Sequence, residues 1–233
     1  MASPLSRYAY INAKLRARIS KILAPATFDQ LTKAPSLDAA LAVLRDTPFA
    51  ALEDIYARTG DLKQAELELL KTEICLYRDI RQYLHANSVQ LIDALLTQFE
   101  IDNLKNAIRI YFDRQVRERA VDTSVHYILH ARIIHDLPID IILNANSLDE
   151  IAGVLTGTPY GPIIRRYGHT VESSGSLFRL EIALDHFYYE NLETAIRRLD
   201  KRDQAIALRL MGIEIDLQNI SWIMRFKNFY DLP

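Results

Sequence analysis

Three histidines come nearest to a metal-binding pattern in this sequence. His126 and His130 are four positions apart, which places both on one face of a helix, and His135 follows nearby. Two imidazoles at that spacing can hold a zinc ion. A metalloprotease helix also requires a glutamate directly after the first histidine, and Tyr127 stands there instead. We therefore interpret the histidines as surface or interface residues, and a helical metalloenzyme stays as an alternative.

Other catalytic patterns are absent from the sequence. It contains no Walker-type phosphate loop, no dinucleotide-binding Gly-x-Gly-x-x-Gly and no Gly-x-Ser-x-Gly nucleophile motif. The stretch GVLTGTPYG has spaced glycines but lacks the lysine and the preceding strand of a phosphate loop. The single cysteine, Cys75, lies in an apolar run, so we expect a small core residue in a reducing compartment. We predict no catalytic residue, no cofactor and no metal, and hence a protein that is not an enzyme.

The sequence repeats itself. SLDAALAVLRDTPFAAL at 36–52 aligns without a gap to SLDEIAGVLTGTPYGPI at 147–163, with seven of seventeen positions identical. Ser36 and Ser147 are typical helix caps, and Glu150 completes a capping box with Ser147. Pro48 and Pro159 bias the preceding threonines away from the helical conformation and so end each segment.

Two further blocks follow in the same order. LLKTEICLYRDI at 69–80 aligns to LFRLEIALDHFY at 177–188, which matches Glu73 to Glu181. FEIDNLKNAIR and EIDLQNISWIMR then match Glu100, Asn103 and Arg109 to Asp216, Asn219 and Arg225. Three ordered blocks predict two copies of a unit of about 110 residues. We place the copies at 1–120 and 121–233.

The elements that position these residues are predicted to be helices throughout. The sequence has only 7 glycines, and 3.6-residue periodicity is visible almost everywhere. We expect long helices over 62–84, 88–112, 176–199 and 203–229, a first helix after Ser3, short helices after Ser36 and Ser147, and a helix over 126–135. DLPIDIIL at 136–143 is interpreted as a connector because of Pro138. The predicted fold class is all-α, with tandem helical subdomains and no convincing strand.

The shared polar residues suggest structural ion pairs. On a helix an acid and the asparagine three positions later lie on one face, and an arginine nine positions after the acid lies opposite. We therefore predict the pairs Glu73–Arg109 and Glu181–Arg225, each joining two long helices of one copy. The predicted structural residues are Glu73, Glu100, Asn103, Arg109, Glu181, Asp216, Asn219 and Arg225.

Charge is unevenly distributed. The chain has 28 basic and 30 acidic residues and a net charge of −2, which gives no indication of nucleic-acid binding. Residues 1–28 contain five basic side chains and no acidic one, and these are Arg7, Lys14, Arg16, Arg18 and Lys21. A cationic first helix can face an anionic partner or a membrane surface, although a solvated helix face is the alternative. No stretch approaches the ~20 apolar residues that span a bilayer.

Four stretches together resemble a known family. YAYINAKLRAR, the block ending in TPYG, FEIDNLKNAIR and EIDLQNISWIMRFK are similar to the C subunit of V/A-type ATPases, called the d subunit in the eukaryotic V-type enzyme. The resemblance covers essentially the whole chain. It implies a non-catalytic central-stalk rotor subunit, which connects the membrane ring of proteolipid (c-type) subunits to the central shaft.

The resemblance also implies a place in the cell and an architecture. The family is peripheral on the cytoplasmic face of the membrane, with no cofactor, nucleic acid or small-molecule substrate. Its fold is a funnel of three helical subdomains, of which this sequence carries the first two, so we expect an exposed apolar strip on the second copy. A free-standing helical-repeat adaptor for another protein is the alternative function.

Overall fold

The computed structural model describes residues 4–118 and 128–229 of the 233-residue chain, with side chains from 8 to 118 and from 128 to 224. Within these ranges the chain forms eleven helices and no strand, which confirms the all-helical prediction. The helices are α1 (Pro4–Ile19), α2 (Pro25–Lys33), α3 (Leu37–Val43), α4 (Ala51–Thr59), α5 (Leu62–Arg81), α6 (Asn87–Gln115), α7 (Ile139–Asn144), α8 (Leu148–Val154), α9 (Tyr160–Ser174), α10 (Phe178–Arg197) and α11 (Lys201–Phe229).

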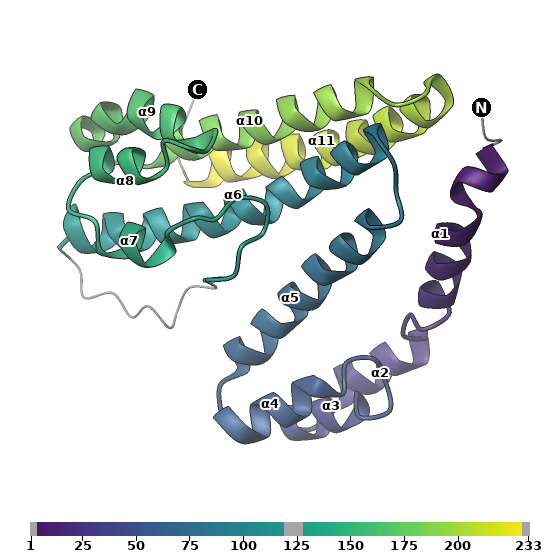
Figure 1. The fold of residues 1–233 in the computed structure, drawn as a ribbon. Coiled ribbons are helices and arrows are strands. Elements are labelled where there is room, and N and C mark those ends of the chain that lie inside the picture. Colours follow the sequence, from purple (N-terminus) through teal and green to yellow (C-terminus); the bar gives the residue numbers. More distant parts are fainter. Residues whose placement is uncertain (1–3, 119–127, 230–233) are drawn as a thin grey trace.

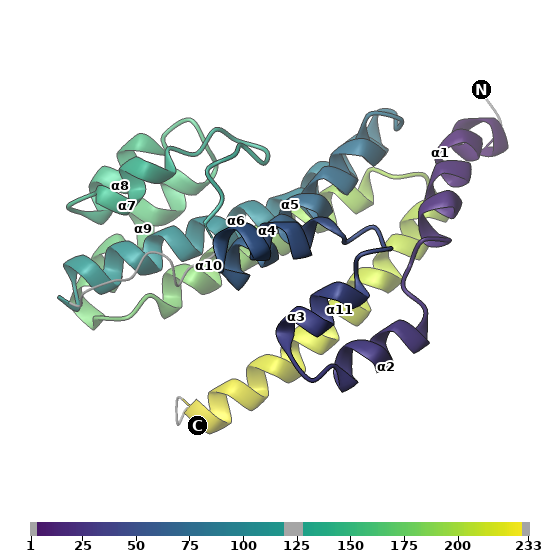
Figure 2. The same ribbon diagram turned by 90° about the horizontal axis from the view of Figure 1, so that it is seen from below.

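The helices are arranged as an open body around α6 (Figure 1). α1 leads down to the short helices α2, α3 and α4, and α5 returns from them to the start of α6. α7, α8 and α9 lie toward the far end of α6, and α10 runs back along it. α11 begins beside the end of α10 and then diverges from it (Figure 2).

The main hydrophobic core joins α6 to the helices that follow it. Its buried residues include Leu104 and Ile108 of α6, Ile142 of α7, Ile151 of α8 and Leu184 of α10. A separate small core lies among α3, α4 and α5, around Leu41, Leu44, Leu52 and Ala65. The last helix of the first sequence unit therefore packs mainly against the second unit.

The two threonine–proline blocks fold alike because they repeat the same local hydrogen bonds. Ser36 accepts from the amide of Ala39 at 3.2 Å, and Ser147 accepts from the amide of Glu150 at 3.1 Å. Thr47 donates to Leu44 O at 2.6 Å, and Thr158 donates to Leu155 O at 2.8 Å. The helices that follow the blocks, α4 and α9, both end at a left-handed glycine, at Gly60 and Gly175.

Matching helices also have matching lengths. α5 and α10 each contain 20 residues, and α6 and α11 each contain 29. Their observed bounds agree with the helices expected over 62–84, 176–199 and 203–229 to within a few residues. The third glycine of GVLTGTPYG, Gly161, lets α9 approach the end of α8, since a Cβ there would lie 2.7 Å from Leu155 O.

Three sequence expectations are corrected by the structure. The helix expected over 126–135 is absent from 128–135, which is irregular, and 126–127 lie outside the described residues. The expected connector 136–143 contains α7, because Pro138 needs no amide donor at a helix start and its carbonyl accepts from Ile141 N and Ile142 N, both at 3.0 Å. Cys75 is exposed on α5 and is not a core residue.

Candidate functional site: the polar contacts of α6 and the free face of α11

Glu100 of α6 is a buried carboxylate, and its hydrogen-bond partners come from residues that follow α6 in the sequence. It is 1% exposed. Its Oε2 accepts from the amides of Ile134 and His135, both at 2.7 Å. Its Oε1 accepts from the Tyr160 hydroxyl at 2.8 Å and lies 2.6 Å from His135 Nδ1. A buried charge is tolerated only with such partners, so Glu100 fixes the segment that leads into α7.

Asn103, one turn further along α6, binds the same segment. Its Nδ2 donates to Leu129 O at 2.8 Å, and its Oδ1 accepts from Leu129 N at 2.7 Å. Both backbone groups of Leu129 are thus satisfied by one amide side chain, as a neighbouring strand would satisfy them. We call Glu100 and Asn103 the acid–amide pair of α6, and residues 129–135 the lead-in segment of the second copy.

The aromatic surroundings of this pair complete its burial. The rings of His135 and Phe187 pack edge-on against Tyr160, with centroid distances of 5.7 and 5.8 Å. Burial, and secondarily the Glu100 carboxylate, raises the pKa of Tyr160, so its hydroxyl stays a donor at physiological pH. The sequence placed Glu100 and Asn103 on one helix face but did not indicate which segment they bind.

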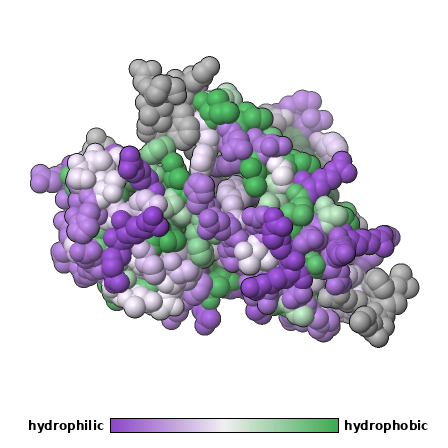
Figure 3. Space-filling view, turned by 90° about the horizontal axis from the view of Figure 1, so that it is seen from above, coloured by the Kyte–Doolittle hydropathy of each residue, from purple (hydrophilic) through white to green (hydrophobic). Residues whose placement is uncertain are grey.

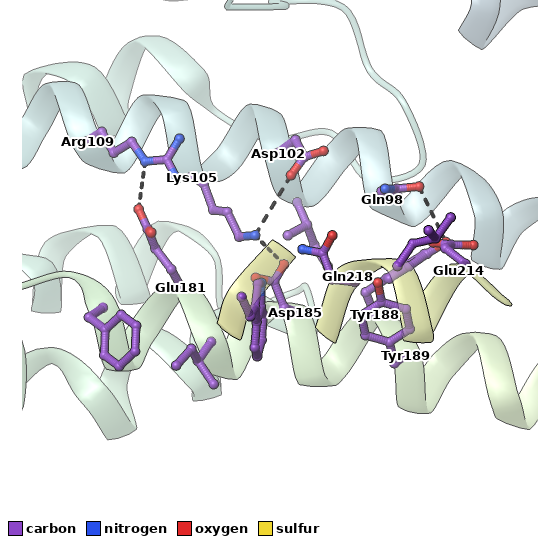
Figure 4. Close-up of a pocket in the computed structure, with 15 residues that line it drawn as sticks. Gln98, Asp102, Lys105, Arg109, Glu181, Asp185, Tyr188, Tyr189, Glu214 and Gln218 are labelled. Carbon is purple, nitrogen blue, oxygen red and sulfur yellow. Dashed lines mark hydrogen bonds and ion pairs between the residues drawn. The ribbon is translucent and has the colours of Figure 1, made fainter. Parts of the chain in front are cut away.

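Ion pairs hold α6 to α10 on the neighbouring face (Figure 4). Lys105 Nζ forms an ion pair with Asp185 Oδ1 and lies 3.8 Å from Asp102 Oδ1. Arg109 Nε donates to Glu181 Oε1 at 2.6 Å. These contacts join a helix of the first sequence unit to a helix of the second.

The partner of Arg109 differs from the prediction. Arg109 pairs with Glu181 and not with Glu73, because its side of α6 faces α10. Glu73 is exposed on α5 and borders a separate small cleft beside α6. For the predicted pair Glu181–Arg225, the side chain of Arg225 lies outside the described residues.

A polar cleft of about 510 Å³ lies between α6, α10 and α11 (Figure 4). Besides the ion-paired residues it is lined by Gln98, Tyr188, Tyr189 and Glu214. Tyr188 donates to Gln98 Oε1 at 3.4 Å. Burial, and then Glu214, raises the pKa of Tyr188 and raises the pKa of Tyr189 to about 12. Among the charged residues that line this cleft, Lys105–Asp185 and Arg109–Glu181 join α6 to α10.

The two histidines of this group that the structure describes, His130 and His135, have different partners. His126 lies outside the described residues, His130 is exposed with its Nδ1 3.3 Å from Asp140, and His135 binds Glu100. Across the part of the chain that the structure describes, no three side chains of the metal-binding types form a cluster.

The basic first helix is partly used inside the molecule. Arg18 pairs with Asp79 of α5, and Lys14 Nζ lies 4.2 Å from the centre of the Tyr83 ring. Arg16 and Lys21 are exposed, and the side chain of Arg7 lies outside the described residues. Two of the five basic side chains therefore also make contacts within the molecule.

α11 presents a row of apolar side chains to solvent. Seven are between 51% and 64% exposed, namely Ile206, Leu210, Ile213, Leu217, Ile220, Ile223 and Met224. This agrees with the apolar strip expected on the second copy. On the face seen from above, apolar side chains form patches among hydrophilic ones (Figure 3).

The aligned positions of α6 are buried. In the register that places Asp216 on Glu100, Leu217 and Ile220 align to Ile101 and Leu104, which are 1% and 0% exposed. Asp216 and Asn219 themselves are exposed. The two helices thus carry the same pattern, covered in one and open in the other.

In the helices that the structure describes, none is long and apolar enough to cross a membrane.

Comparison with known proteins gives one consistent match. The model of the ATP synthase (C/AC39) subunit family matches residues 11–233. The C subunit of the A-type ATP synthase of Methanocaldococcus jannaschii is 24% identical over 231 residues, which cover 97% of this chain and 56% of the relative. That of Methanosphaera stadtmanae is 26% identical over 220 residues, covering 94% and 54%. The chain therefore spans little more than half the length of these curated relatives.

Proposed function

The chain belongs to the ATP synthase (C/AC39) subunit family, and from that premise we propose that it is a non-catalytic central-stalk subunit of a V/A-type rotary ATPase. In this role it is a rigid spacer between the membrane ring of proteolipid subunits and the central shaft. The observation that carries the proposal is the family match, which runs from residue 11 to residue 233. The relatives it resembles are C subunits of A-type ATP synthases.

The contacts along α6 suit a part that transmits torque. A spacer has to turn as one body, so its long helices must not slide or bend against each other. α6 and α10 share the main core, and the pairs Lys105–Asp185 and Arg109–Glu181 connect them beside that core. Close-packed interiors transmit strain, which supports a mechanical role for this half of the molecule.

The proposed organisation is two copies of one helical unit, 1–120 and 121–233, within a funnel that includes a third unit. The equal lengths of α5 and α10 and of α6 and α11 support it. So do the repeated serine and threonine hydrogen bonds that flank α3 and α8. The proposed location is the cytoplasmic face of the membrane, reached through the ring of proteolipid subunits, with Arg16 and Lys21 among the exposed cations near it.

The test is co-purification from solubilised membranes that contain the rotary ATPase. Tagged chain is expected to recover proteolipid and central-shaft subunits in fixed proportion. The control is Arg16→Ala/Lys21→Ala, which should weaken recovery at low salt but not remove it, because screened surface charges contribute little. Recovery of neither class of subunit would contradict the proposal.

The alternative is an adaptor for another protein, and the exposed row on α11 is the observation that favours it. An adaptor would bind a soluble partner in the absence of membranes. If the tagged chain recovers a stoichiometric soluble protein and no ATPase subunit, the adaptor replaces the rotor function.

A further inference from the structure

We propose that the surface between α9 and α10 is a docking site for an acidic amphipathic helix of a partner protein. The two helices run side by side (Figure 1). Between residues 162–167 of α9 and residues 179–190 of α10 lies a cleft of about 630 Å³, which we call the α9–α10 groove. The proposal goes beyond the proposed function and does not depend on it, because the groove lies apart from the acid–amide pair and from the row on α11.

Apolar side chains line the α9–α10 groove along its length. Ile163 of α9 and Ile182, Ala183 and Phe187 of α10 are among them, and each is partly exposed. On α10 the lining positions between 179 and 190 recur at i, i+3, i+4, i+7, i+8 and i+11, so they share one face of the helix over about 16 Å. A partner helix of about three turns would cover this face with its own apolar stripe.

Two arginines and a histidine border the apolar lining. Arg166 extends from α9, Arg179 and His186 extend from α10, and all three are exposed. Among the described residues, none of the three forms an ion pair with an acidic side chain. Arg166 Cζ lies 5.6 Å from the centre of the Tyr167 ring, a contact that restricts the arginine without neutralising its charge. The groove therefore offers positive charge that the molecule itself does not use.

The charges of the α9–α10 groove differ from those between α6 and α10. There, Lys105 is paired with Asp185 and Arg109 with Glu181. α10 thus directs these two acids toward α6 and directs Arg179 toward the groove. A guanidinium binds a carboxylate through two parallel hydrogen bonds, and such pairs gain strength beside apolar groups that exclude water. Two arginines beside apolar side chains therefore favour a ligand that carries both carboxylates and an apolar surface.

Glu190 gives the groove a direction. It is exposed at the far end of the lined face of α10, eleven positions beyond Arg179. A docked helix would place its carboxylates near Arg166 and Arg179 and a neutral or basic side chain near Glu190, because like charges held close together repel. The partner is therefore an amphipathic helix whose acids are concentrated toward one end of its apolar stripe.

Two other anionic ligands fit the groove less well. A bilayer with anionic headgroups is a broad surface, so it would meet the carboxylate of Glu190 together with the arginines, and it would not reach the half-buried Ile163 and Ile182 between the helices. A small anion such as phosphate would bind the arginines but would leave the apolar lining exposed to water. Binding of either in place of the helix is an outcome that would overturn the proposal.

The experiment measures the binding of a synthetic helix to the full chain. The probe is a fluorescein-labelled peptide of about 15 residues with leucines at i, i+3, i+4 and i+7, glutamates beside them toward one end, and one benzoylphenylalanine in the leucine stripe. Fluorescence anisotropy gives its affinity at low and at physiological salt. We expect binding that weakens with salt, and at least about tenfold weaker binding when the same residues are scrambled or when lysines replace the glutamates.

A pair of charge-reversed variants tests the arginines. Arg166→Glu/Arg179→Glu should lower the affinity for the acidic peptide about tenfold or more. Arg58→Glu/Arg202→Glu makes the same change of net charge at exposed arginines of α4 and α11 and should leave the affinity within about twofold. Urea unfolding checks that both variants are folded. Equal affinities for the two variants would overturn the inference.

The position of the photocrosslink and two further probes complete the test. After irradiation, the peptide should be joined to residues 162–167 or 179–190, and crosslinks confined to other parts of the chain would overturn the inference. So would a failure of the acidic peptide to bind, including the case in which phosphatidylglycerol vesicles or inorganic phosphate bind through Arg166 and Arg179 instead. These measurements use the chain alone, so their outcome is distinguishable from that of the proposed function, which depends on recovery of ATPase subunits.

Discussion

α6 and α11 are the same length and carry the same acid–asparagine pattern, yet one is the most buried helix and the other is largely open. Both contain 29 residues. Leu104 of α6 is 0% exposed, and Ile220, which aligns to it, is 55% exposed. The difference does not come from the helix itself. α6 is followed by a unit that folds back onto it, and among the described residues no such unit covers the outer face of α11 (Figure 2).

The comparison shows that the polar residues of α6 make their main contacts with the second sequence unit and not within the first. Glu100, Asn103, Lys105 and Arg109 all belong to the first sequence unit, and all bind residues of the second. In this chain α6 is therefore the surface against which the helices that follow it pack. In the isolated chain the same substitution should therefore destabilise the fold much more on α6 than on α11, and the following experiments use that contrast.

The largest contrast is expected between Glu100 of α6 and Asp216, the residue that aligns to it on α11. Glu100→Ala leaves two backbone amides and a buried tyrosine hydroxyl without their acceptor, so it should lower the free energy of unfolding by about 3–5 kcal/mol. Asp216→Ala in the isolated chain should change it by less than about 0.5 kcal/mol. Urea unfolding followed by circular dichroism measures both. Comparable losses for the two variants would mean that α11 is covered in the isolated chain.

The next largest contrast is in stability between apolar side chains at aligned positions of α6 and α11. Leu104→Ala creates a cavity in the main core and should cost about 2–5 kcal/mol. Ile220→Ala, at the aligned position on α11, should cost less than about 0.5 kcal/mol in the isolated chain. The urea midpoints of the two variants measure the difference in stability. A large loss of stability in Ile220→Ala would mean that this face of α11 is not open to solvent.

A smaller effect is expected at the ion pair between α6 and α10. Arg109 is 43% and Glu181 28% exposed, so solvent weakens the attraction. A double-mutant cycle with Arg109→Ala and Glu181→Ala should give a coupling energy of about 0.5–1 kcal/mol. The pair Arg197–Glu193, within α10, is the control and should give about 0.3–0.5 kcal/mol. Zero coupling between Arg109 and Glu181 would remove this pair from the account of rigidity.

The smallest effect is a change of stability in alkali. Burial raises the pKa of Tyr189 from 10.0 to about 12, so folding favours the protonated hydroxyl. This contribution is fully present below about pH 10, the ordinary pKa of tyrosine, and is lost as pH rises toward 12. Tyr189→Phe should therefore make the fall in unfolding free energy between pH 9 and pH 11 shallower than in the unchanged chain. An identical slope would show that Tyr189 is not protected from solvent.

Local chemistry made much of the fold predictable from sequence. Ser36 and Ser147 are predicted as helix caps, and Pro48 and Pro159 as the ends of the two segments, because these residues act on neighbours only a few positions away. Such contacts do not depend on the rest of the molecule. The all-helical class and the bounds of the long helices follow from the same kind of information.

Contacts between units were not predictable in this way. Periodicity identifies the faces of α6 but not the elements that cover them, so the sequence predicts Glu73 as the partner of Arg109, whereas the structure shows Glu181. Residues 128–135 have apolar spacing typical of a helix, but Glu100 and Asn103 bind their backbone groups directly and replace the helical hydrogen bonds. Cys75 lies in an apolar run, yet it occupies the open side of α5.

The most direct test of the comparison is the reactivity of a cysteine at position 220. In a Cys75→Ser background, Ile220→Cys should react with iodoacetamide in the isolated chain at close to the rate of an unfolded peptide, whereas Leu104→Cys should react at least about a hundredfold more slowly, because its site opens only by unfolding. In the assembled rotary ATPase we predict that the cysteine at position 220 becomes protected as well. If it reacts equally fast in the complex and in the isolated chain, the face of α11 is not a docking surface for a further unit.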